Sequence, residues 1–201
     1  IRPAPNALSA SGFSGHGVAL ATLAGKQMAD AVAEAWRRIP AEKTGSARML
    51  FTAHSVPNAH DNVGGADGDK NLYSRQVAEA SRLVAERAGI SDYDLVWQSR
   101  SGNPKTPWLE PDIVDHTTAI HDYDGVDAVV VCPIGFISDH MEVIWDLDTE
   151  LVDEARELGV TVTRCATPGP SREFARMVLE RGLGLVYLLA FANALHQFPA
   201  L

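Results

Sequence analysis

Three carboxylates recur at a spacing of four residues, at Glu142, Asp146 and Glu150. On a regular helix such a row drifts by about 40° at each step and still shares one face, and a wider local π-turn would align it better. Because like charges at this spacing repel, the row is easiest to explain if a cation or basic side chains compensate it. The open alternative is a solvated acidic face near a helix start, where negative charge suits the helix dipole.

A histidine, His54, follows a short apolar run and stands directly before the sequence Ser-Val-Pro. At a strand end before a proline-fixed turn, its imidazole would be available to accept a proton or to bind a borderline metal ion. A histidine that only caps the following turn is an equal alternative from this segment alone.

Three polar residues near these two segments are weaker candidates for a chemical role. His140 stands two residues before Glu142, and helical spacing predicts that it points away from the Glu142 face. His60 and Asp61 lie in a loop rich in Gly, Asp and Asn, and we predict that both are solvated.

After about residue 46, short β-branched runs alternate with helical stretches, which favours an α/β fold with a parallel sheet flanked by helices. The run over 126–132 is apolar throughout, as expected of a central parallel strand covered on both faces. The other expected strands are 49–52, 94–97 and 160–165, and the expected helices are 70–88, 112–122, 139–158 (capped by Ser138 or Asp139) and one from Ser171. Ligands in such sheets bind beyond the carboxyl ends of the strands, where His54 falls.

Composition narrows the class of protein. With 46% hydrophobic and 21% charged residues over 201 positions, the chain is globular, and its net charge of -9 argues against nucleic acid and anionic membranes as partners. The two cysteines, Cys132 and Cys165, sit in apolar runs and are interpreted as core residues in a reducing compartment. The apolar stretch 183–195 is shorter than the ~20 residues of a membrane-spanning helix, and no signal peptide is visible, so we expect a soluble, cytoplasmic protein.

Four segments, in order and at sensible spacing, resemble ferrochelatase, with the closest likeness to the actinobacterial form that metallates coproporphyrin III. They are Thr52–Pro57, Gln98–Gly102, Pro107–Pro111 and Pro133–Val143, and the resemblance covers roughly residues 30–182. It implies a Rossmann-like half of a class II chelatase. The implied activity is insertion of Fe²⁺ into a porphyrin, coproporphyrin III or protoporphyrin IX, in heme biosynthesis.

The resemblance also implies residue roles. His54 would receive pyrrole protons or ligate the incoming iron, and Glu142 would oppose it on the same side of the macrocycle. Asp146 and Glu150 would continue as an acidic line that delivers metal. This agrees with the chemistry, because metallation removes two N–H protons and needs a base near neutrality beside hard oxygen donors.

Substrate-binding candidates surround this pair. By resemblance, Trp108 contacts the porphyrin edge. We predict that Ser99, Phe136 and Ile137 also bind the substrate, although Trp108, Phe136 and Ile137 would suit an ordinary core equally well. We expect no obligatory cofactor, with Fe²⁺ as substrate. Some relatives carry an iron–sulfur cluster on four cysteines, and a chain with two is not expected to do so.

The sequence departs from the family outside its middle part, and we divide it into an atypical segment with a helix (1–45), a ferrochelatase-type α/β domain (46–182) and an apolar tail (183–201). The resemblance implies a protein of two similar halves, of which these 201 residues resemble the C-terminal one. Residues 11–20 instead resemble the closing glycine-rich turn of flavin-dependent amino-acid and amine oxidases, or simply form a glycine-rich turn before an Ala-rich helix. Three hypotheses follow: a working ferrochelatase, a half that binds metal or tetrapyrrole without turnover, and flavin binding by the N-terminal segment. Self-association through the incomplete cleft is a further option.

Overall fold

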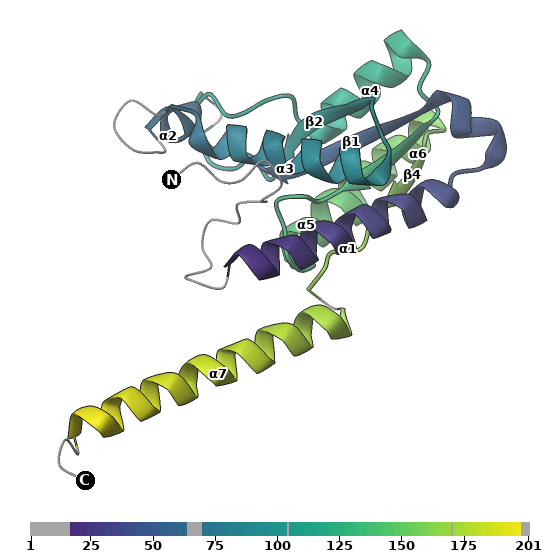
Figure 1. Ribbon diagram of the computed structural model, residues 1–201. Coiled ribbons are helices and arrows are strands. Elements are labelled where there is room, and N and C mark those ends of the chain that lie inside the picture. The colour runs from purple at the N-terminus through teal and green to yellow at the C-terminus, as the bar shows by residue number, and fades with distance from the viewer. Residues whose placement is uncertain (1–16, 64–69, 104, 170, 198–201) are drawn as a thin grey trace.

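The structure, a computed structural model, describes residues 17–63, 70–103, 105–169 and 171–197 (Figure 1). Four parallel strands form one sheet in the order β2-β1-β3-β4. The strands are β1 (Ala47–His54), β2 (Tyr93–Gln98), β3 (Ala128–Cys132) and β4 (Thr161–Arg164). The helices are α1 (Gly17–Arg37), η1 (Ala41–Ser46), α2 (Asn58–Val63), α3 (Leu72–Ala88), α4 (Ile113–Asp124), α5 (Met141–Trp145), the π-helical segment η2 (Asp146–Glu150), α6 (Leu151–Leu158) and α7 (Arg172–Gln197). The predicted parallel sheet flanked by helices is therefore confirmed.

Alternate side chains of β1 serve two different cores, because successive residues of a strand face opposite sides of the sheet. Met49 and Phe51 pack with residues of α1 and α3, whereas Leu50 packs with residues of α4 and α6. Helix α1, which the sequence assigned to the N-terminal segment, thus contributes to the same core as the sheet. By the same alternation, His54 lies on the Leu50 side, toward α4 to α6.

The direction of the chain connections changes between β1 and β3. From β1 the chain passes through α3 on one face to β2, and from β3 it passes through α5, η2 and α6 on the other face to β4. The adjacent carboxyl ends of β1 and β3 therefore form the topological switch point, where ligands bind in open α/β sheets. His54 ends β1 at this place.

The predicted helix over 139–158 is divided into α5, η2 and α6, with the π-helical turn that the acidic spacing favours. The prediction that Ser138 or Asp139 caps this helix is wrong. The cap position is His140, which makes no side-chain cap bond. The Asp139 carboxylate instead binds Arg164, since a charge-assisted ion pair is stronger than a bond to a neutral amide.

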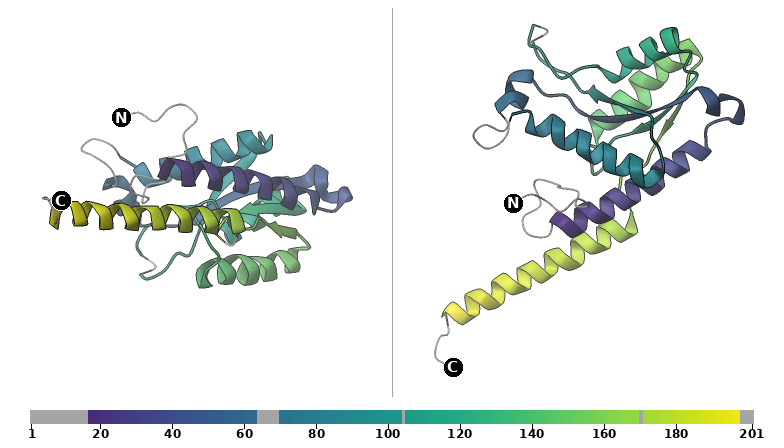
Figure 2. Two further views of the ribbon diagram at one scale, coloured as in Figure 1. Left: turned by 60° about the horizontal axis from the view of Figure 1, so that its bottom comes forward. Right: turned by 45° about the horizontal axis from the view of Figure 1, so that its top comes forward.

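Helix α7 includes most of the predicted apolar tail. It begins one residue after Ser171 and continues to Gln197, extending away from the sheet (Figure 2). Phe174 is buried near its start, but its large apolar side chains farther along are exposed, namely Val178, Leu179, Leu183, Leu185, Val186, Tyr187, Leu188, Leu189 and Phe191. Within the described ranges, no helix has the length and apolar character needed to cross a membrane. Residues 11–16 of the flavin-oxidase-like segment lie outside the described residues.

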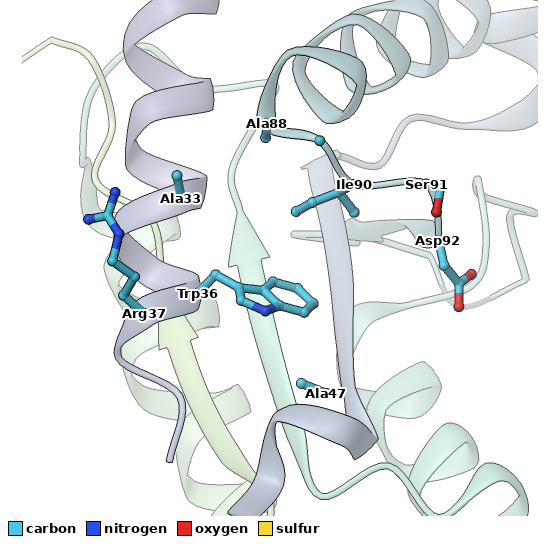
Figure 3. Close-up of a pocket in the computed structure, with 9 residues that line it drawn as sticks. Ala33, Trp36, Arg37, Ala47, Ala88, Ile90, Ser91 and Asp92 are labelled. Carbon is cyan, nitrogen blue, oxygen red and sulfur yellow. The ribbon is translucent and has the colours of Figure 1, made fainter. Parts of the chain in front are cut away.

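A pocket of about 470 Å³ lies at the amino end of β1, between the last turns of α1 and α3 (Figure 3). Trp36 and Ile90 line it, with Arg37 and Asp92 at its polar edge. Ala47, the first residue of β1, also lines the pocket, whereas His54 is the last residue of that strand. This pocket is therefore distinct from the residues that the sequence selects for chemistry.

A buried carboxylate fixes the connection from β1 to α3. Asp61 is only 1% exposed, so the prediction that it is solvated is wrong. It accepts hydrogen bonds from the Asn71 side chain and from the backbone N–H and hydroxyl of Ser74, at 2.7–3.0 Å. Burial by itself raises the pKa of Asp61, but these hydrogen bonds outweigh burial and leave its pKa below the ordinary value. Donors from α3 thus replace the water that the loop composition led us to expect.

We predict that Asp61→Asn lowers the free energy of unfolding by about 2 kcal/mol at pH 7, because the amide cannot accept all three hydrogen bonds. A carboxylate whose pKa is lowered on folding stabilises the protein above its unfolded pKa of about 3.9, and this contribution is lost as the pH falls through the folded pKa. Urea unfolding at several pH values should therefore show that the difference in free energy of unfolding between wild type and variant becomes smaller below about pH 4. Asp30→Asn, at an exposed position of α1, is the control and should show no such difference.

Candidate active site

The imidazole of His54 is oriented by its own backbone neighbour. Nδ1 lies 2.5 Å from the carbonyl oxygen of Ser55, which can only accept, so Nδ1 carries the hydrogen. The other nitrogen, Nε2, faces Glu142, with 3.9 Å between Nε2 and Oε2. The neutral ring therefore directs its lone pair toward the carboxylate, and the protonated ring would form an ion pair with it.

The loop that carries Trp108 is joined to the chain just after His54. The Ser55 hydroxyl donates to the Leu109 carbonyl at 2.9 Å, and the Leu109 N–H donates to the Val56 carbonyl at 3.0 Å. Trp108 itself pairs with Pro57 in an isolated antiparallel bridge, and its indole nitrogen is buried with no hydrogen-bond partner among the described residues. These bonds place the predicted porphyrin-edge residue on the same rim as the histidine.

Close backbone packing holds the loop after β3 against the end of β1. A Cβ at Gly135 would lie 2.6 Å from the Cβ of Ala53 and 2.9 Å from its Cα, so only glycine fits. The Gly135 N–H also donates to the Thr52 carbonyl at 3.2 Å. This contact, directly beside His54, sets where the chain leads into α5 and Glu142.

His140 lies closer to Glu142 than the sequence predicted, with 3.9 Å between Nδ1 and Oε2. The prediction that it points away is wrong because His140 precedes α5 in an extended conformation, so helical spacing does not apply. Its ring packs edge-on against Phe136 at 5.1 Å between centroids. The Glu142 carboxylate thus lies near two imidazoles, those of His54 and His140.

Asp146 continues the acidic row toward β2. Its carboxylate accepts a hydrogen bond from the Gln98 side chain at 3.2 Å and another from the Ser99 hydroxyl. Gln98 is the register partner of His54, and its side-chain oxygen accepts from Thr52 at 3.1 Å. Ser99, predicted to bind substrate, therefore holds Asp146, and it does so from a left-handed backbone conformation with φ of 63°.

Glu150 forms the outer end of the row. Burial raises the pKa of Glu150, and the negative charges of Asp146 and Asp112 raise it further. Its interaction with Asp146 shows that η2 brings these two carboxylates together. From Glu142 beside β1, through Asp146 at the end of β2, the row leads to Glu150 near Asp112 at the start of α4.

The apolar candidates differ in exposure. Phe136 is buried with Val143 and Leu147, so it belongs mainly to the core. Ile137 is 42% exposed, and three further apolar side chains of α5 are also exposed: Met141, Ile144 and Trp145. These three were not predicted as site residues, although Ile144 and Trp145 were expected to pack alongside the acidic row, and their place in the sequence next to Glu142 was the available signal.

Side chains of the types that bind metal ions are not clustered in the described part of the chain. Among the described residues, no three His, Cys, Asp or Glu side chains are arranged to hold a metal ion. Cys132 and Cys165 are both buried and free, which confirms that they are core residues. The hydrogen bond with Cys165 and burial raise the pKa of Cys132, so its thiol stays protonated.

Comparison with known proteins identifies the family of this fold and site. A sequence profile described as ferrochelatase matches residues 25–181. The chain belongs to the ferrochelatase family. It is 56% identical over 153 residues to coproporphyrin III ferrochelatase of Corynebacterium glutamicum strain R, which covers 76% of this chain and 41% of that relative. The corresponding protein of Nocardia farcinica is 58% identical over 154 residues, covering 76% of this chain and 43% of its own length.

This ferrochelatase-family chain thus spans about two fifths of the length of the relatives that it matches. Among solved structures, the DR2241 protein of Deinococcus radiodurans, described as similar to chelatases, aligns with a TM-score of 0.36 at 16% identity, over 78% of this chain and 29% of that one.

We predict that Gly135→Ala lowers the free energy of unfolding by about 1–3 kcal/mol, because the added methyl group meets the backbone of Ala53. Gly45→Ala is the matched control, since a Cβ there meets nothing within 4 Å. Thermal and urea unfolding of both variants would measure the difference. Equal stability of the two would contradict the packing described for the loop after β3.

Proposed function

We propose that this chain supplies the metal-inserting wall of a ferrochelatase, which places Fe²⁺ in coproporphyrin III or protoporphyrin IX for heme biosynthesis. The observation that carries the proposal is the approach of Nε2 of His54 to Oε2 of Glu142, 3.9 Å apart at the switch point between β1 and β3. The names of the relatives favour coproporphyrin III as the substrate.

The proton chemistry rests on His54. Insertion of Fe²⁺ into the macrocycle releases two protons from pyrrole nitrogens, and a base near neutrality must accept them in turn. Nε2 is the nitrogen without hydrogen, because Nδ1 donates to the Ser55 carbonyl. Once Nε2 is protonated, Glu142 stabilises the imidazolium and passes the proton outward, since its side chain is 57% exposed.

The metal chemistry rests on the acidic row. We infer that Fe²⁺, as substrate, enters at Glu150, passes Asp146 and reaches Glu142 and His54. Oxygen ligands followed by an imidazole suit a hydrated ferrous ion that must exchange its waters stepwise. The position of Glu150 near Asp146 and Asp112 supports this order, because their negative charges, which add to burial in raising the pKa of Glu150, would be relieved by an arriving cation.

The macrocycle would lie against the apolar residues near this pair. Ile137, Met141 and Trp145 present exposed apolar surface beside Glu142, and Trp108 lies on the adjoining loop. Flat, mostly apolar ligands bind such surfaces, with a few polar groups fixing their orientation.

The alternative is a half that binds metal or tetrapyrrole without turnover. It needs only the groups on this wall, the His54–Glu142 pair and the acidic row, which could hold a cation without inserting it. Self-association is one way to complete a cleft, with a second copy of the chain facing this wall. A cytoplasmic location stays a prediction.

We predict that the chain inserts Fe²⁺ into coproporphyrin III, which the change in the absorption spectrum of the porphyrin would measure. His54→Ala should lower the rate of insertion at least 100-fold, because it removes the base. His60→Ala, at an exposed histidine on α2, should keep the wild-type rate. Full turnover in His54→Ala would remove His54 from the mechanism. No turnover in wild type would leave the binding alternative.

We predict that Co²⁺, a spectroscopic substitute for Fe²⁺, binds saturably and that Glu142→Gln weakens this binding about tenfold, because an amide is a poorer ligand than a carboxylate. Titration followed by visible absorption would measure both constants. Glu154→Gln on α6 is the control for loss of one negative charge. Unchanged affinity in Glu142→Gln would mean that the acidic row is only a solvated face.

A further inference from the structure

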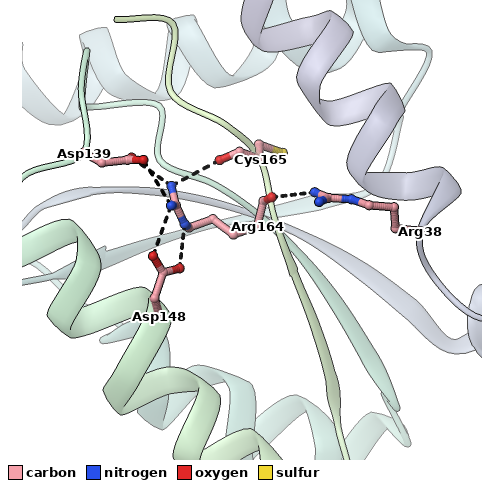
Figure 4. A network of polar contacts seen from close by, with 5 residues as sticks. All are labelled: Arg38, Asp139, Asp148, Arg164 and Cys165. Atoms are coloured by element: carbon pink, nitrogen blue, oxygen red, sulfur yellow. Dashed lines mark hydrogen bonds and ion pairs between the residues drawn. The ribbon is translucent and has the colours of Figure 1, made fainter. Parts of the chain in front are cut away.

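Arg164, the last residue of β4, binds two carboxylates on either side of Glu142: Asp139, just before α5, and Asp148, within η2 (Figure 4). Its Nε and Nη2 donate to Asp148 at 2.7 and 3.1 Å, and its Nη1 and Nη2 donate to Asp139 at 2.9 and 3.2 Å. The arginine side chain is only 18% exposed. Burial lowers the pKa of Arg164, but the two carboxylates outweigh burial and raise it, so the guanidinium stays charged.

The two carboxylates stand on either side of the site residues. Asp139 precedes Glu142 by three residues and Asp148 follows Asp146 by two, within η2. Arg164 therefore holds both ends of the segment that carries Glu142 and Asp146, although it forms hydrogen bonds with neither of these two residues. Arg38, which donates to the Arg164 carbonyl at 2.7 Å, ties this strand end to the chain after α1.

The start of α5 needs such support because its own sequence supplies little. The cap residue, His140, makes no side-chain cap bond, and α5 has only five residues before η2 begins. A helix start without a side-chain cap leaves backbone N–H groups unsatisfied and frays readily. Five carboxylates fall between residues 139 and 150, and without Arg164 their repulsion would spread this segment.

We propose that Arg164 is a positioning residue that fixes the Glu142 carboxylate against Nε2 of His54 by clamping Asp139 and Asp148 together. Its importance for metal insertion rests on the proposed function, but the positioning itself is a property of this fold. Arginine is suited to the role because its planar fork serves two carboxylates at once, whereas a lysine ammonium has no such geometry.

The test compares wild type, Arg164→Met, Arg164→Lys, Glu142→Gln and the double variant Arg164→Met/Glu142→Gln. Arg156→Met is the matched control, since Arg156 is an exposed arginine on α6 that forms a local ion pair with Asp153. Asp148→Asn breaks half of the clamp and serves if Arg164→Met does not fold, as judged by circular dichroism.

The first readout is metal-free: the NMR shift of the His54 ring proton at fixed pH. We expect Glu142→Gln and Arg164→Met to move this signal away from its wild-type position, and Arg164→Lys to bring it back only slightly. The double variant should match Glu142→Gln alone, because Arg164 acts through Glu142. An unmoved signal in Arg164→Met and Asp148→Asn, or additive shifts in the double variant, would overturn the clamp.

The second readout is Co²⁺ affinity. We expect about a tenfold loss in Arg164→Met and no further loss in the double variant relative to Glu142→Gln. If wild type binds no Co²⁺, the proposed function fails, and the NMR result still decides on the clamp. Equal affinity of Arg164→Met and wild type, with Glu142→Gln weakened, would show that Arg164 does not position Glu142.

Discussion

The loop after β3 lies so close to the end of β1 that a Cβ at Gly135 would come within 2.6 Å of Ala53. The same closeness recurs behind this loop, where a Cβ at Gly169 would come 2.6 Å from the carbonyl oxygen of Ile137. The loop is thus held between β1 and the chain that follows β4. Because interiors resist displacement of packed backbone, the position of α5 relative to His54 follows from these two contacts.

Charge is distributed over the acidic segment in three distinct ways. Arg164 neutralises Asp139 and Asp148, hydrogen bonds from the end of β2 satisfy Asp146, and Glu142 and Glu150 keep exposed carboxylates. Among the described contacts, Glu142, Asp146 and Glu150 have no arginine or lysine partner, and of these three only Asp146 accepts hydrogen bonds from the end of β2. The carboxylates best placed to meet a cation are therefore the two ends of the row.

Much of this arrangement could be predicted from local sequence. The apolar run over 126–132 contains β3, and the four-residue spacing of carboxylates anticipated the π-helical turn. The roles of Asp61 and Arg164 could not be predicted, because their partners lie 10 to 25 residues away and depend on how strands and helices meet. His140 was misjudged because helical spacing was applied to a residue that precedes the helix.

The π-helical turn carries a consequence for engineering. Such a turn contains one residue more than a regular helix would use, so deleting Thr149 would let α5 and α6 join as a continuous α-helix. An idealised backbone of that kind tends to be more stable. Yet the deletion would shorten the interval between Asp146 and Glu150 from four residues to three, which would change the angle between these two carboxylates around the helix axis. Stability gained by regularising this helix would come with an altered spacing of the acidic row, so the irregular turn is the feature to preserve in any redesign.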